Sequence, residues 1–304
     1  MLAVGNQIMN LKKTGQSAIK TLACLLSLGA GLNLATAQPV LLDFGQTNVA
    51  APYLATDPGH ANGTISGTYT SWNAIKSSAA TSALSYGDGT AATGLTLTMG
   101  QEATSGSSII SYSTAIASLN LAGTGGNVPG QRNLLGSGSI YGNDNSSTAV
   151  GRDGFFGGAG SAIGLRLDGL TAGNYLVYVM ARNCNSDVVS APMNIFSFAG
   201  ALAGVFDFSS LTATTEANTG YPTATYANQY NTFQAGENYV GLSVTVGSGD
   251  SLYLAIDGAG TELRGFMNMV EIVPASVPEP ATLAIFGLGF FALALVLRKR
   301  QTVL

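Results

Sequence analysis

Residues 175–182 read Tyr-Leu-Val-Tyr-Val-Met-Ala-Arg, and this segment is the strongest local indication of the fold. It is rich in aromatic and β-branched side chains, a composition typical of a β-strand. Gly173 and Asn174 precede it as a turn, and before that turn residues 163–167 alternate large apolar residues with glycine or arginine. A strand, a turn and a second strand in succession indicate antiparallel β-structure.

Further strands are expected on both sides of this pair. They are residues 39–44, 95–99, 240–246, 251–256 and 266–273, each apolar or alternating with period two. No segment between residues 38 and 274 has a sustained helical period with caps. The sequence therefore predicts an all-β ectodomain, a β-sandwich or jelly roll, over residues 38–274. Two polar regions inside it, residues 100–160 and 212–234, are expected to be mainly loops.

The charge distribution separates this domain from the two ends of the chain. The chain has 304 residues, of which only 9% are charged and 40 are glycine. Six of the 12 basic residues lie near the termini, whereas 15 of the 16 acidic residues lie between residues 38 and 274, which gives that segment a net charge of −9. Because it has no basic stripe to neutralise phosphates, we expect no nucleic-acid partner.

The amino-terminal residues 1–37 have the three parts of a secretory signal peptide. A positive region with three lysines precedes an apolar stretch at residues 22–34, and Ala35-Thr36-Ala37 follows. Signal peptidase requires small residues such as Ala35 and Ala37 before its cleavage point, so cleavage is expected after Ala37. A short buried helix is the alternative interpretation.

The carboxyl-terminal part contains an uncharged apolar run of 17 residues at 281–297, ATLAIFGLGFFALALVL. As a helix this run would be about 25 Å long, close to the ~30 Å of a bilayer core, and it predicts one transmembrane helix. Arg298, Lys299 and Arg300 follow directly and act as a stop-transfer signal. They begin a basic cytoplasmic tail, residues 298–304, which places the preceding domain outside. A buried core helix is again the alternative.

A short linker, residues 275–280, joins the domain to this apolar run. It contains Val277-Pro278-Glu279-Pro280, in which each proline fixes its own φ and keeps the preceding residue out of the helical region. The tetrapeptide is therefore extended and has no internal hydrogen bonds, a form in which a protease can bind its backbone. A rigid spacer before the helix is the simpler interpretation of the two prolines alone.

The order of Val277-Pro278-Glu279-Pro280, a short apolar helix and Arg298-Lys299-Arg300 resembles the PEP-CTERM sorting signal of Gram-negative bacteria that make exopolysaccharide. The resemblance covers residues 277–300. It implies export through the secretion machinery, transient anchoring in the membrane by the C-terminal helix, and processing by an exosortase, a membrane cysteine protease. The freed protein would join the cell surface or the extracellular matrix. A permanently anchored ectodomain is the alternative if the tail is not cut.

Short motifs in the domain offer little chemistry. Gly249-Asp250-Ser251-Leu252 spells the GDSL serine block of a lipase and esterase family, but no histidine follows it and His60 is the only histidine, so we interpret it as a hairpin turn. Gly158-Ala159-Gly160 is interpreted as a flexible turn. One histidine and the single mature cysteine, Cys184, cannot build a common zinc site. No cofactor is expected, although a structural calcium and a pair of glycosidase carboxylates both stay open.

Two functional hypotheses follow. The first is an exported, non-enzymatic cell-surface or matrix protein associated with exopolysaccharide, and the alternative is a secreted carbohydrate-active enzyme with the same sorting tail. Aromatic residues in polar segments are candidates for stacking on sugars, although each can instead close a loop over the core: Tyr69, Trp72, Tyr112, Tyr141, Tyr226 and Tyr230. Residues 42–45, 72–73, 169–175 and 266–272 also resemble segments of galactose-binding-like β-sandwich domains.

Overall fold

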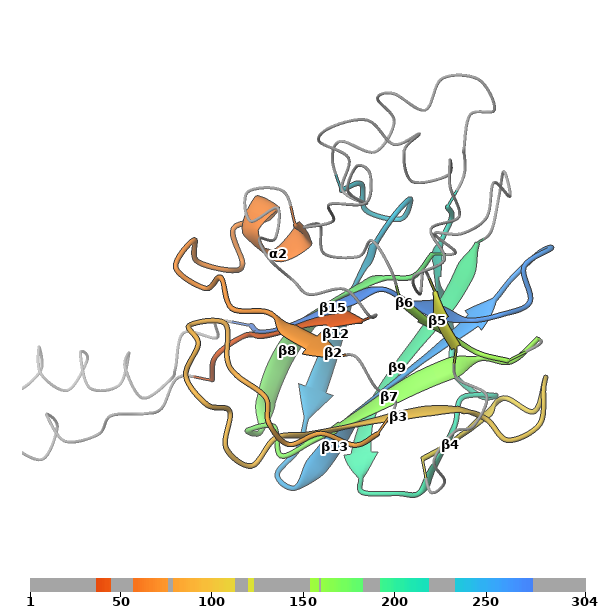
Figure 1. Ribbon diagram of the computed structural model, residues 1–304, viewed down its shortest axis with the longest axis horizontal. Coiled ribbons are helices and arrows are strands. Elements are labelled where there is room, and N and C mark those ends of the chain that lie inside the picture. Colours follow the sequence, from red (N-terminus) through yellow and green to blue (C-terminus); the bar gives the residue numbers. More distant parts are fainter. Residues whose placement is uncertain are drawn as a thin grey trace, which may run out of the picture. The chain divides into compact units, whose positions relative to one another are not determined.

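The strands expected from the sequence form a β-sandwich in the computed structural model (Figure 1). The structure describes residues 37–44, 57–75, 79–112, 120–122, 154–158, 160–182, 192–218 and 233–275. A boundary between Ala37 and Gln38 divides the chain into two units, and every described strand belongs to the second. Those described residues contain fifteen strands and one helix of four residues, which confirms the all-β prediction.

Two large sheets carry most of the strands. The five-stranded sheet has the order β12-β8-β15-β1-β2, and the seven-stranded sheet has the order β10-β4-β3-β7-β13-β9-β11. The strands of the first are β1 (Val40–Phe44), β2 (Asn73–Ile75), β8 (Gly173–Met180), β12 (Val240–Val246) and β15 (Met269–Pro274). Those of the second are β3 (Thr96–Glu102), β4 (Ile109–Ser111), β7 (Ile163–Asp168), β9 (Met193–Ala201), β10 (Val205–Asp207), β11 (Thr214–Glu216) and β13 (Asp250–Gly258). A small third sheet joins β14 (Phe266–Met267), β6 (Gly154–Phe156) and β5 (Asn120–Ala122).

Period-two alternation builds the core between the two large sheets. In β12 the residues Val240, Leu242, Val244 and Val246 are buried while those between them are exposed. They share one apolar cluster with residues of the facing sheet, such as Leu254 of β13. Each fully buried branched side chain contributes roughly 1.5–3 kcal/mol, so this two-layer core is the main source of stability in a domain without a described disulfide.

The opening and closing strands of the domain lie next to each other in the five-stranded sheet. β15 pairs with β1 on one side and with β8 on the other, both antiparallel, with Val40 opposite Ile272. The single strand expected at residues 266–273 is interrupted at Asn268, whose Oδ1 accepts a hydrogen bond of 2.7 Å from the amide of Arg182. This side chain connects the end of β8 to the gap between β14 and β15.

The outer face of the five-stranded sheet is covered by the segment that follows β1 in the described chain. Its short helix, α2 (Pro58–Ala61), lies on the side of β15 and β1 that faces away from β3, β7 and β13 (Figure 1). Ile65 packs there with Leu41, Tyr178 and Val273 in a second apolar cluster. Because both faces of β1 are covered, all five of its residues are buried.

Three expectations about the domain need correction. The region 100–160 contains β4, β5 and β6, and the region 212–234 contains β11, and each of these strands has only three residues, too few to show an alternation. Strand β9, nine residues long, was not expected: the positions that follow Ile195 on its core side hold the small residues Ser197, Ala199 and Ala201, and Phe196 and Phe198 lie on the other face. The turn at Gly249 exists, with a positive φ of 81°, but it is not a hairpin: β12 and β13 belong to different sheets.

The two predicted hydrophobic ends lie beyond what the structure describes. Among the described residues there is no helix of sufficient length and apolarity to cross a membrane. The predicted transmembrane helix (281–297), the basic tail (298–304) and all but the last residue of the signal peptide are outside those residues, and only Ala275 of the linker is described.

Candidate functional site

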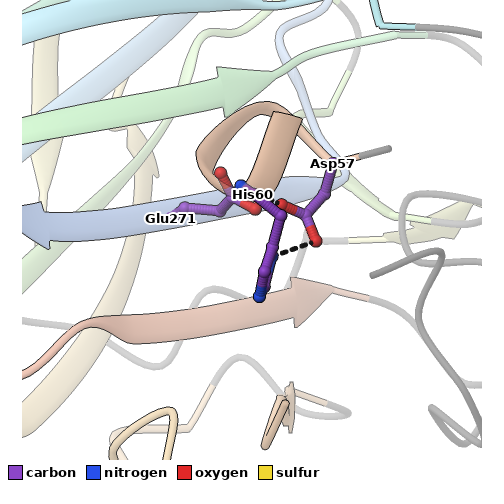
Figure 2. A group of neighbouring side chains, drawn as sticks. All are labelled: Asp57, His60 and Glu271. Atoms are coloured by element: carbon purple, nitrogen blue, oxygen red, sulfur yellow. Dashed lines mark hydrogen bonds and ion pairs between the residues drawn. The ribbon is translucent and has the colours of Figure 1, made fainter. Parts of the chain in front are cut away.

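The described part of the chain brings its one histidine together with two carboxylates, Asp57 and Glu271 (Figure 2). Asp57 caps the short helix α2: its Oδ1 accepts the backbone amide of His60 at 2.9 Å. Pro58 lies at the start of the helix, where a backbone N–H has no partner within the helix. The missing N–H of proline therefore costs no hydrogen bond there. This local geometry also brings the His60 ring to its own cap, with Nδ1 lying 2.8 Å from Oδ1 and 2.7 Å from Oδ2 of Asp57.

Glu271 reaches the same place from the middle of β15. It lies opposite Leu41 on β1 and Tyr178 on β8, on the outer face of the sheet, and α2 covers it completely. Its Oε2 accepts the amide of Gly59 at 2.8 Å. A Cβ at position 59 would meet the side chain of Ile65 and lie 3.0 Å from Oε2 of Glu271, so only glycine allows this close approach.

The three side chains are almost entirely withdrawn from water. The exposed fraction is 5% for the His60 side chain, 2% for Asp57 and zero for Glu271. Burial raises the pKa of Glu271 well above its ordinary value, and the neighbouring charge and hydrogen bonding of Asp57 raise it further, against the opposing effect of the Gly59 amide. A carboxyl group in these surroundings favours a bound proton or a nearby cation over a free negative charge.

Two atoms of this cluster have unused hydrogen-bonding capacity. Oε1 of Glu271 and Nε2 of His60 are both buried and have no partner among the described residues. One donor atom from each of the three side chains lies within 4.8 Å of the others, which is compact enough to surround a single cation. A zinc site built from histidine and cysteine alone was not expected from the sequence, and this mixed set of nitrogen and oxygen donors was not predicted either.

The GDSL serine is not part of this site. Ser251 is 2% exposed and its Oγ donates a hydrogen bond of 2.7 Å to Oδ1 of Asp168. Asp168 in turn binds the guanidinium of Arg166, with an Nε–Oδ1 distance of 2.9 Å. Ser251 thus fixes a structural ion pair on the seven-stranded sheet, as the non-catalytic interpretation of the motif requires.

A more open pocket of about 460 Å³ lies beside the small third sheet. Arg264 lines it and is held by Glu262 through two bonds of 2.7 and 2.8 Å. The guanidinium lies 5.1 Å from the ring centre of Phe156 and 5.2 Å from that of Phe266, which is within cation–π range. The turn interpreted from Gly158-Ala159-Gly160 contributes Gly158 and Gly160 to the same lining.

The aromatic residues proposed for sugar stacking belong to two different apolar clusters in the described structure. Tyr112 is buried and its hydroxyl donates to the carbonyl oxygen of Leu165 at 2.9 Å. Tyr69 and Trp72 are half-buried and pack on the apolar cluster around Tyr239. Tyr112 closes over the core, stacking on sugars stays a prediction for the half-buried Tyr69 and Trp72, and Tyr141, Tyr226 and Tyr230 lie outside the described residues.

The predicted sorting residues also lie outside the described residues. These are Ala35, the motif Val277-Pro278-Glu279-Pro280 and the basic group Arg298-Lys299-Arg300, and Cys184 is outside as well. Ala37 is described and exposed. Asp57 and Glu271 were not predicted as site residues, although a lone carboxylate within the apolar run 266–273 is a signal in the sequence that points to Glu271.

Comparison with known proteins identifies the sorting signal. Residues 276–300 match the PEP-CTERM protein-sorting motif. No match was found among the curated proteins. The chain therefore carries the signal of an exosortase-processed protein, exported with a membrane-anchored C-terminus and directed to the cell surface.

Proposed function

We propose that this protein is a non-enzymatic component of the cell surface or extracellular matrix, and that its β-sandwich contacts exopolysaccharide after an exosortase has removed the tail. The PEP-CTERM motif at residues 276–300 is the observation that carries the proposal. The signal-peptide pattern at residues 1–37 supports it, because such a motif acts only on an exported chain.

The pocket beside Arg264 is the place in the sandwich best suited to a saccharide. Sugar rings present apolar C–H faces and hydroxyl groups, and a pocket that combines aromatic rings with a few fixed polar groups suits both. Arg264 offers N–H donors beside the ring of Phe156, which lines the pocket, and Glu262 keeps its guanidinium in position. The Arg264 side chain remains 35% exposed, so a polymer can reach it without rearrangement.

The net charge favours a particular class of polysaccharide. Residues 38–274 carry a charge of −9, which repels a densely anionic chain at low salt. A neutral or weakly charged exopolysaccharide is therefore the partner class that we propose.

The enzymatic alternative requires two carboxylates that a sugar can reach. Asp57 and Glu271 are close together but buried. Asp257 interacts electrostatically with Glu102, yet the two Glu102 oxygens already accept three backbone amides, those of Gly106, Ser108 and Ala162. These arrangements favour a binding role over hydrolysis.

The sorting step is tested by intact mass and fractionation in a host that has the exosortase. We expect the unmodified protein to lose about 25 C-terminal residues and to leave the membrane. A Glu279→Ala, Pro280→Ala variant is expected to keep Leu304 and stay in the membrane fraction. If both proteins keep Leu304, the proposed processing is wrong.

Polysaccharide contact is tested separately by co-sedimentation with exopolysaccharide purified from the same host. Arg264→Gln is expected to weaken retention at least fivefold. Arg166→Gln is the matched control, because Arg166 is also paired with a carboxylate and lies over an aromatic ring, that of Tyr112, but does not line this pocket. Equal retention of all three proteins would contradict the assignment of the pocket, and release of soluble sugar by the unmodified protein would favour the enzymatic alternative.

A further inference from the structure

Asp57, His60 and Glu271 each place one donor atom within 4.8 Å of the donor atoms of the other two. The Gly59 amide occupies Oε2 of Glu271, and the His60 amide occupies Oδ1 of Asp57. Oε1 of Glu271 has no partner, and Oδ2 of Asp57 and Nδ1 of His60 lie 2.7 Å apart in a hydrogen bond that an ion bound between them would replace. Nε2 of His60 lies on the far side of the ring from both carboxylates (Figure 2).

From this geometry we infer that Asp57, His60 and Glu271 form a binding site for one divalent transition-metal ion of the zinc type. The set consists of one imidazole nitrogen and two carboxylate oxygens, which are ligands that zinc accepts. Three protein ligands leave one position for water, as in zinc sites that are not closed by four side chains. This site is independent of the sorting signal and of the pocket beside Arg264.

The spacing of the donors fits such an ion. Zinc binds nitrogen and oxygen at ~2.0–2.2 Å, so two ligands of a tetrahedral site stand roughly 3.4 Å apart. The three donors already lie within 4.8 Å of one another. Small side-chain rotations therefore complete the site, without movement of the strand or the helix.

The charge balance gives the physical reason for a cation. As metal ligands the two carboxylates and the imidazole would be deprotonated and would together carry two negative charges, so a divalent ion gives a neutral set in a space that water hardly reaches. The unpartnered Oε1 of Glu271, on a residue with no exposed surface, is an independent sign that the cluster lacks a ligand. A buried acceptor left unsatisfied costs about 1–3 kcal/mol, which a coordinated ion removes.

The backbone amides supply the outer layer that such sites need. They hold one oxygen of each carboxylate and so orient the other toward the ion, which strengthens metal binding in known sites. Calcium suits the cluster less well, because it takes six to eight oxygen ligands and no imidazole. Comparing the binding of zinc with that of calcium therefore distinguishes this proposed site from the structural calcium site that the sequence left open.

The experiment is isothermal titration of the full-length protein, without a histidine tag and stripped with a chelator, with Zn²⁺ and separately with Ca²⁺. We expect one Zn²⁺ per chain and an increase in the melting temperature on binding. His60→Gln and Glu271→Gln are each expected to weaken Zn²⁺ binding at least tenfold. Co²⁺ is expected to give the visible absorption of a four-coordinate ion, and the same variants are expected to abolish it.

Glu216→Gln is the matched control. Glu216 is equally buried, but it lies on β11 at the edge of the other sheet, so its substitution tests whether a general loss of folding explains weakened binding. We expect this variant to bind Zn²⁺ like the unmodified protein. Circular dichroism before titration confirms that each variant is folded.

Several results would overturn the assignment. They are the absence of Zn²⁺ binding, binding of Ca²⁺ but not Zn²⁺, and Zn²⁺ binding that is unchanged in His60→Gln and Glu271→Gln. If Zn²⁺ does not bind, the two carboxylates share a proton instead. If Zn²⁺ binding is unchanged in the two variants, the ion is held elsewhere in the chain. Equal loss in Glu216→Gln would also contradict a specific site.

Discussion

The backbone amide of Gly59 donates a hydrogen bond of 2.8 Å to Oε2 of Glu271, a residue 212 positions later in the chain. This bond fastens the short helix α2 to the central strand β15 of the five-stranded sheet. It requires a glycine, because any side chain at position 59 would collide with Ile65. The covering of the sheet and the geometry of the buried cluster therefore depend on the same contact.

Gly59→Ala is expected to destabilise the domain by about 1–3 kcal/mol, since the added methyl group pushes α2 away from β15. The measurement is the urea midpoint of the unmodified and variant proteins. Gly67→Ala is the control: a Cβ at position 67 meets no atom within 4 Å, so a change below about 0.5 kcal/mol is expected. Similar effects of the two substitutions would show that the close approach at Gly59 is not important for stability.

Asn73→Leu is expected to cost about 2–4 kcal/mol of unfolding free energy. The Asn73 amide donates to the carbonyl oxygens of Leu41 and Ser85 at 3.0 and 2.8 Å, and its Oδ1 accepts the amide of Ser85 at 2.7 Å. Leucine would leave these buried backbone groups without partners. Asn194→Ala, which removes one bond of 2.9 Å from Thr215, provides the comparison and is expected to cost less than about 1 kcal/mol. A smaller loss for Asn73→Leu than for Asn194→Ala would contradict this reasoning.

Arg182→Met is expected to destabilise the protein, because it removes the positive charge that opposes the raised pKa of the buried Glu216. Arg182 is 2% exposed and Glu216 is fully buried. Burial raises the pKa of Glu216 well above its ordinary value, while the Ala181 amide and the charge of Arg182 lower it. We expect the double variant Arg182→Met, Glu216→Leu to recover much of the loss in thermal unfolding. Purely additive effects of the two substitutions would exclude a coupling between these side chains.

Asp257 predicts a specific pH dependence. Burial, and then the charge of Glu102, raise its pKa from 3.8 to about 6. The folded state therefore holds this proton more tightly than the unfolded state, so the stability contributed by the protonated group is complete below pH 3.8 and declines as the pH rises to about 6.

Asp257→Asn removes this decline and is expected to raise the stability at pH 8 by about 1 kcal/mol, a figure reduced for solvent screening of a partly exposed group. The measurement is a series of urea unfolding curves between pH 3.5 and pH 8. Parallel pH profiles for the two proteins would contradict the raised pKa.

The local pattern of the sequence predicted much of the sandwich. Residues 240–246 alternate strictly, and β12 has these bounds with its apolar residues in the core. Short strands such as β4 and β11 were not predicted, because three residues are too few to show a period. The turn before β13 was predicted, but its course from one sheet to the other was not, since a turn sequence does not specify which strands it connects.

The signal-peptide pattern and the sorting motif at the two ends of the chain can be recognised without a tertiary structure. Cleavage and sorting machineries read short linear segments, and the match at residues 276–300 confirms the sorting motif that Val277-Pro278-Glu279-Pro280 indicated. The signal peptide and the resemblance to galactose-binding-like domains stay predictions.

Only the tertiary structure determined the surroundings of Glu271. Alternation along 266–273 places this residue on the face opposite Val270 and Ile272, where a carboxylate is expected to meet water. The helix α2 covers that face and brings Asp57 and His60 with it. Residue order fixes which side chains share a face of a strand, but what covers that face depends on contacts between segments far apart in the chain, which no local pattern encodes.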